Sequence, residues 1–195
     1  MMSDVSSVCR PGTRIGTDDR IAAWTWHVSP KAVEFNGSTY WGVTVPVGGG
    51  RSGAAIARFD HQRDTCTHSP ILAVTGAADD HCNPSVLVLP DGRLIAGVAG
   101  HTSDRLWYAI SSTPGSVTDW VPTRELAPRR MTRFSYSQMV FLNEEGPSGR
   151  IYWFFRAGVT SSKLLRRLLR LSGMVNCWAY TTSDDFVESW SGARV

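Results

Sequence analysis

Two histidines flank a predicted β-hairpin in this sequence, and their spacing makes them the first candidates for chemistry. Residues 79–104 have the pattern strand, turn, strand, with His81 before the first strand and His101 after the second. If the strands pair through the turn at Pro90–Gly92, both rings lie at the end of the hairpin opposite that turn. Imidazole rings are suited to proton transfer near neutral pH. A single histidine is more often a hydrogen-bonded structural residue than a catalyst. His27, His61 and His68 have no such paired position, and a structural role is the simpler interpretation for them.

A tyrosine and an arginine occupy corresponding places in the next strand–turn–strand unit. We expect Tyr136 to open the first strand of that unit and Arg156 to close the second. An arginine pairs both oxygens of a carboxylate and stays charged, whereas a phenol can exchange a proton. We therefore predict that His81, His101, Tyr136 and Arg156 converge on one concave face, within roughly 10 Å of one another.

The elements that must position these residues form three units of strand-like runs broken by turn residues. Asn36-Gly37 between alternating apolar runs is a strong hairpin signal in the first unit. The second and third units share one order of strands and turns and each ends near a tryptophan. A repeat of about 45–55 residues with four short strands is typical of a β-propeller blade. We predict an all-β fold, a partial β-propeller of about three four-stranded antiparallel blades. The predicted ranges are a ragged N-terminus at 1–21 and a propeller domain at 22–195, with blades at about 22–78, 79–128 and 129–195.

The third unit ends in a degenerate Asp box, the S-x-D-x-G-x-T-W turn of sialidase-type repeats. In residues 183–190 the Ser183, Asp185, Ser189 and Trp190 positions match, and Val187 replaces the glycine. Residues 112–120 are a more degenerate copy. Taken alone, each is equally explained as a surface turn with a packed tryptophan.

A basic, amphipathic segment at 161–173 does not fit a blade. Its leucines share one side of a predicted short helix and its lysine and arginines share the other. We interpret it as an insertion that packs its leucines onto the sheet and supplies no catalytic group. Binding to an acidic polymer or to a membrane surface is the alternative.

Composition limits the classes of partner and leaves the compartment open. The net charge of +3 and the 42% hydrophobic content are those of a globular protein, and we expect neither nucleic acid nor a membrane as partner. The four cysteines match no zinc signature, and their spacing leaves disulfides undecided. The N-terminus has no apolar core of signal-peptide length. Three blades do not close a ring, so we expect the chain to be a fragment of a longer protein.

Several segments together resemble the BNR-repeat family that includes propeller-fold polysaccharide lyases, notably ulvan lyases. They are AWTWHVSPKAV, DDHCNPSVLVLPDGRL, AGHTSDRLWYAIS, SYSQMVFL and YWFFRAG, which follow in order over residues 22–160. The resemblance implies a secreted or periplasmic protein, with the family's active-site residues on His81, His101, Tyr136 and Arg156. Cys82 departs from the family pattern.

The implied activity is β-elimination on an acidic, uronate-containing polysaccharide. Arginine would neutralise the uronate carboxylate, and histidine or tyrosine would move the protons. This chemistry requires no cofactor, and a structural metal stays undecided, as does the oligomeric state. Two alternatives remain: a sialidase-like glycoside hydrolase and a non-catalytic carbohydrate-binding propeller. Trp24, Trp26 and Trp107 are candidates for stacking on sugars, although packing between blades is the commoner role for such residues.

Overall fold

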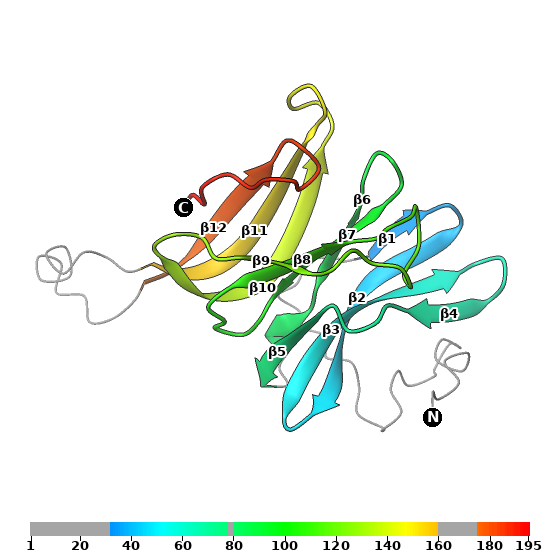
Figure 1. Ribbon diagram of the computed structural model, residues 1–195, viewed down its shortest axis with the longest axis horizontal. Helices are drawn as coiled ribbons and strands as arrows, with labels where there is room; N and C mark the ends of the chain where they lie inside the picture. Colours follow the sequence, from blue (N-terminus) through cyan, green and yellow to red (C-terminus); the bar gives the residue numbers. More distant parts are fainter. Residues whose placement is uncertain (1–31, 78–79, 160–174) are drawn as a thin grey trace, which may run out of the picture.

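The computed structural model describes residues 32–77, 80–159 and 175–195, and these residues form three antiparallel β-sheets that follow one another along the chain (Figure 1). No α-helix occurs among them, and the single helical element is a short 3-10 turn. The all-β prediction is confirmed. The predicted helix-like insert, the N-terminal segment 1–21, Trp24 and Trp26 lie outside the described residues.

The first sheet has five strands, not four. Its order is β1-β2-β3-β4, and the fifth strand also pairs with β3, beyond the part of β3 that pairs with β4. Asn36 and Gly37 form the predicted turn with φ angles of 48° and 68°. The strands are β1 (Ala32–Phe35), β2 (Ser38–Gly48), β3 (Arg51–Asp60), β4 (Thr65–His68) and β5 (Ala73–Ala77).

The second sheet has the four consecutive strands expected of a blade, in the order β6-β7-β8-β9. Its first hairpin turns where the sequence predicts, and Gly92 takes a φ of 83° there, a conformation that favours glycine. The elements are the 3-10 turn η2 (Asp80–Cys82), then β6 (Ser85–Val88), β7 (Leu94–Ala99), β8 (Leu106–Ile110) and β9 (Arg124–Leu126).

The third sheet has three strands and the beginning of a fourth. Its strands are β10 (Met131–Leu142), β11 (Arg150–Val159) and β12 (Val175–Ser183), in that order. The chain then returns along the outer edge, where Arg194 forms an isolated antiparallel bridge with Tyr180. β10 starts five residues before Tyr136, so the expectation that Tyr136 opens this strand is wrong.

Neighbouring sheets are joined by apolar cores. The largest core lies between the second and third sheets and includes Leu106, Phe134, Trp153 and Phe155, all with no exposed surface. A smaller core, which includes Tyr40, joins the first sheet to the second. Burial of such large side chains is the main force that holds the sheets together.

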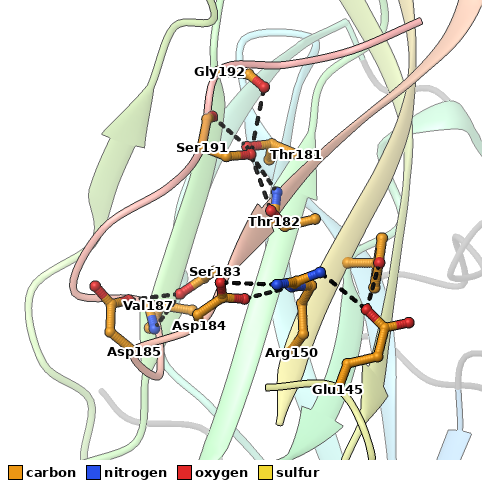
Figure 2. Close-up of polar contacts among 11 residues, drawn as sticks. Glu145, Arg150, Thr181, Thr182, Ser183, Asp184, Asp185, Val187, Ser191 and Gly192 are labelled. Atoms are coloured by element: carbon orange, nitrogen blue, oxygen red, sulfur yellow. Dashed lines mark hydrogen bonds and ion pairs between the residues drawn. The ribbon is translucent and has the colours of Figure 1, made fainter. Parts of the chain in front are cut away.

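The degenerate Asp box is a real turn at the end of the third sheet (Figure 2). Asp185 accepts hydrogen bonds from the Ser183 hydroxyl at 2.8 Å, and from the Ser189 amide at 3.0 Å and hydroxyl at 2.5 Å. Val187 donates its backbone N–H to the Ser183 hydroxyl and buries its side chain completely. Val187 also has a φ of 69°, the left-handed conformation for which the consensus uses glycine.

Candidate active site

The two histidines of the second sheet stack on each other. His81 belongs to the turn η2 that leads into β6, and His101 follows β7 in a turn. Their ring centroids are 4.0 Å apart and the ring planes differ by 6°. The β6–β7 pairing brings the two segments together at the end opposite the Gly92 turn, which is the arrangement that the sequence predicts.

Tyr136 and Arg156 extend this contact into the third sheet. The Tyr136 ring centroid lies 4.8 Å from that of His81, and the guanidinium carbon of Arg156 lies 4.8 Å from the Tyr136 ring centroid. Arg156 comes from β11, the strand next to β10. The structure therefore brings the four predicted residues into one continuous group, which we call the His–His–Tyr–Arg cluster.

Tyr136 reaches this position through an irregularity in β10. The pairing of β10 with β11 shifts register on both sides of Ser135, which marks β-bulges. Tyr136 has a φ of 57°, a conformation that costs a non-glycine residue of order 1–3 kcal/mol. Bulges redirect side chains, and such strain is common at functional sites. The bulge turns the tyrosine toward the histidines from inside a long strand.

Ser135 links the two halves of the cluster. Its buried hydroxyl oxygen accepts hydrogen bonds from the backbone N–H of Thr102 at 3.0 Å and from Arg156 Nη2 at 3.3 Å. Ser103 and Phe134 add a pair of backbone hydrogen bonds beside it, at 3.1 and 2.8 Å. One serine thus connects the loop that carries His101 with the arginine of the next sheet.

A buried polar network supports the cluster from below. Ser137 receives a hydrogen bond from Trp153 Nε1 at 2.8 Å and donates one to the carbonyl of Gly97 at 2.8 Å. Its hydroxyl also lies 2.9 Å from that of Ser85. Because β6, β7, β10 and β11 all contribute, this network fixes the second sheet against the third.

The first sheet supports the segment that follows His81. Thr44 Oγ1 on β2 donates a hydrogen bond to Asn83 Oδ1 at 2.7 Å, and both residues are buried. Gly42, also on β2, lies directly against the backbone of Pro84. A side chain at position 42 would overlap the Pro84 carbonyl oxygen, so the close approach requires glycine.

Arg156 retains unused hydrogen-bonding capacity. Its Nε is buried and has no hydrogen-bond partner, and no acidic side chain among the described residues forms an ion pair with it. A guanidinium carries five donors in a planar fork, and this arrangement matches a carboxylate. Because Arg156 is partly exposed and has no acidic partner in the described part of the chain, its charge is available to an anion from solution.

Trp178 is a further site residue that the sequence analysis missed. It lies on β12 opposite Arg156, its ring centroid is 6.2 Å from that of Tyr136, and 61% of its surface is exposed. The alternation of a strand puts Trp178 on the face opposite to Ala179 and Thr181, and only the structure shows that the face with Ala179 and Thr181 is the buried one. Trp107, the other tryptophan candidate in the described residues, makes its contacts within the second sheet and with the core beside it. Its indole N–H donates to Glu125 on the second sheet.

Within the described residues, no group of three or more histidine, cysteine or acidic side chains is arranged to hold a metal ion. Cys82, the departure from the family pattern, is buried. No helix of the described part is long and apolar enough to cross a bilayer.

Comparison with known proteins places the chain in a family. A profile described as "BNR repeat-containing family member" matches residues 49–188, which is most of the sequence. The chain belongs to this BNR repeat-containing family. No curated protein matches the sequence.

Solved structures of polysaccharide lyases share the fold of this BNR-repeat protein. One is an ulvan lyase of family PL25 bound to -[GlcA(1-4)Rha3S]-, and a second is also a PL25 ulvan lyase. Each matches with 21% identity and a TM-score of 0.57, over 89% of this chain and 38% of that one. The polysaccharide lyase Uly1 matches with 10% identity and a TM-score of 0.50, over 97% of this chain and 48% of that one. The chain thus spans less than half the length of each lyase.

Proposed function

We propose that this BNR-repeat protein binds a uronate-containing acidic polysaccharide and cleaves it by β-elimination. The observation that carries the proposal is the His–His–Tyr–Arg cluster, in which two imidazoles, a phenol and a guanidinium lie in continuous contact. The likeness to lyases supports it at the level of the fold.

Arg156 is proposed to hold the uronate carboxylate. The C5 proton of a uronate is only weakly acidic while the adjacent carboxylate is fully charged, because removal of the proton places more negative charge beside it. A bidentate arginine delocalises that charge and stabilises the transition state. Arg156 is partly exposed and forms no ion pair with an acidic side chain of the described residues, which supports this role.

Tyr136 is proposed to take the C5 proton, and the histidine pair to protonate the leaving group. Tyr136 lies closest to Arg156, and so closest to the carbon next to the bound carboxylate. His81 contacts the Tyr136 ring and stacks on His101, so in this proposal the 4-linked sugar leaves beside the histidine pair. The C5–H electrons form the C4–C5 double bond, the bond from C4 to the glycosidic oxygen breaks, and that oxygen receives a proton from imidazole.

The test is direct, because elimination creates a conjugated unsaturated uronate that absorbs ultraviolet light. The purified chain should generate this absorbance from ulvan or another uronan, and Arg156→Ala should lower the rate at least about a hundredfold. Arg51→Ala is the matched control, since it removes an exposed arginine of β3 in the first sheet and should leave the rate unchanged.

Two outcomes would contradict the proposal. Release of reducing ends without unsaturated product would indicate hydrolysis. Binding of the polysaccharide without any cleavage would indicate a carbohydrate-binding propeller.

A further inference from the structure

Trp178 is the only exposed aromatic residue among Phe, Tyr and Trp in the described part of the chain. It lies in a regular strand and not in a loop, with Arg156 directly opposite it on β11. An indole with 61% of its surface in water leaves a large apolar area uncovered next to a charged group.

We propose that Trp178 forms a sugar-binding subsite, in which the indole stacks on the pyranose ring next to the uronate held by Arg156. This subsite rests on the proposed lyase function and extends it to the neighbouring sugar. The ligand is the apolar C–H face of a sugar in an acidic polysaccharide.

The neighbouring aromatic residues show why packing within the sheet does not account for Trp178. Tyr180, two residues further along β12, is half-buried and lies 5.8 Å from Tyr152 and 5.7 Å from Phe154, measured between ring centroids. These three rings cover one another. Trp178 lies at the end of this row, and its ring contacts that of Tyr136 in the cluster.

The arrangement also indicates the direction of the bound polysaccharide. The cluster begins on the second sheet, and Tyr136, Arg156 and Trp178 continue it over β10, β11 and β12. Adjacent strands lie about 4.8 Å apart, so the indole lies about two strand spacings from β10. The glycan would therefore run across the strands of the third sheet, from the histidines toward its outer edge.

The experiment compares wild type with Trp178→Ala and Trp178→Phe. Sulfated uronate oligosaccharides prepared from ulvan are titrated into each protein by calorimetry and by tryptophan fluorescence. We expect Trp178→Ala to bind about tenfold more weakly, which is about 1.4 kcal/mol, and Trp178→Phe to lose less than about threefold. KM should rise more than kcat falls, and the fluorescence change on binding should disappear in Trp178→Phe.

Val140→Ala is the matched control, because it removes a partly exposed apolar side chain from β10 and touches none of the proposed contacts. It should bind as wild type does. Thermal unfolding of Trp178→Ala should be close to that of wild type, since the side chain is mostly exposed.

The outcomes separate the subsite from the lyase proposal. Unchanged affinity in Trp178→Ala, with elimination that still depends on Arg156, overturns the subsite and leaves the lyase function standing. A change in oligomeric state without a change in glycan affinity also overturns it, since Trp178 would then be a protein contact. Absence of binding and cleavage in the wild-type chain overturns both proposals.

Discussion

Tyr136 holds a backbone conformation that tyrosine rarely adopts, and its place in the cluster depends on it. A regular strand would point alternate side chains to opposite faces and would leave the ring away from the histidines. The bulged segment around Ser135 instead places the ring between His81 and Arg156. The ring contacts with His81 and Arg156 offset part of the strain at this residue.

Ser135→Ala is expected to weaken uronate binding through Arg156. The substitution removes the hydroxyl that accepts hydrogen bonds from the Thr102 backbone N–H and from Arg156 Nη2. The Thr102 loop and the Arg156 side chain are then held less firmly in place. We expect about 1–2 kcal/mol of lost stability and about tenfold weaker binding of a uronate oligosaccharide. Calorimetry and chemical denaturation measure these quantities.

A double-mutant cycle distinguishes positioning from a general effect on the fold. If Ser135 acts through Arg156, adding Ser135→Ala to Arg156→Ala should not weaken binding any further. Independent, additive losses of affinity would refute the positioning role.

Asp185 is expected to make the fold sensitive to acid. Hydrogen bonds, foremost that from the Ser189 hydroxyl, hold the pKa of Asp185 below its ordinary value of 3.8. A carboxyl with a lowered pKa in the folded state contributes stability above pH 3.8, and this contribution disappears as the pH falls through the folded-state pKa. Asp185→Asn should therefore have a lower Tm than wild type at neutral pH.

The difference in Tm between the two proteins should shrink as the pH falls below 3.8. Thermal unfolding followed by circular dichroism over a pH series measures it. A difference that stayed constant, or grew, on acidification would show that the Asp185 charge does not stabilise the turn.

At the scale of single elements, the Asp-box turn of the third sheet combines a buried valine with a left-handed backbone. Replacing Val187 by alanine or glycine removes buried apolar surface in both cases, but only glycine relieves the strain at a φ of 69°. In an ordinary strand or turn, glycine is less stable than alanine. Here Val187→Gly should be more stable than Val187→Ala by about 1 kcal/mol. Urea denaturation measures the two stabilities. A Val187→Ala protein more stable than Val187→Gly would contradict this prediction.

The contact of β2 with the segment after His81 is expected to tolerate no side chain. Gly42→Ala would place a methyl group onto the Pro84 carbonyl, which is backbone and has no means of rotating away. We expect a loss of at least about 2 kcal/mol in unfolding free energy and a displaced His81. Gly76→Ala on β5 is the control, because nothing lies within 4 Å of its added carbon. Equal effects of the two substitutions would argue against this contact.

The sequence predicted those elements that local chemistry determines. The Asn36-Gly37 and Pro90–Gly92 turns were predicted because their residues accept the required φ angles, and the second hairpin placed His81 and His101 together. The bulge before Tyr136 was not predictable in this way, since neither Arg133 nor Tyr136 is a residue type that indicates positive φ.

In the third sheet, Tyr136 and Arg156 lie close together as predicted, but their positions along the strands differ from the prediction. Tyr136 and Arg156 were expected at strand ends, and both lie within their strands. Trp178 escaped notice because its exposure depends on which face the neighbouring strands cover, and that is a property of the assembled sheets. The roles of all these residues in chemistry stay predictions.

At the scale of the whole molecule, the sheets are expected to differ in stability. β7 is buried at every position, and β11 buries alternate residues in the largest core. β4 is a short edge strand with three of its four residues exposed. Amide hydrogens of β7 and β11 should therefore exchange slowest, and those of β4 fastest among the strands.

Hydrogen exchange followed by mass spectrometry measures this order. If the amide hydrogens of the first sheet exchanged as slowly as those of the other two sheets, the prediction would be wrong. The small core between the first and second sheets would then be enough for all three sheets to unfold together.

The position of the cluster at the seam between two sheets has a consequence for the history of the gene. The second repeat contributes only imidazoles and the third contributes only the phenol and the guanidinium, so no single repeat contains all the groups of the proposed site. Copying one repeat alone would not have produced the cluster until neighbouring copies diverged at corresponding positions. Recombination that exchanged the two repeats would retain every residue and most of each sheet's internal packing, and would still remove the contact between the histidines and the tyrosine–arginine pair on which the proposed function depends.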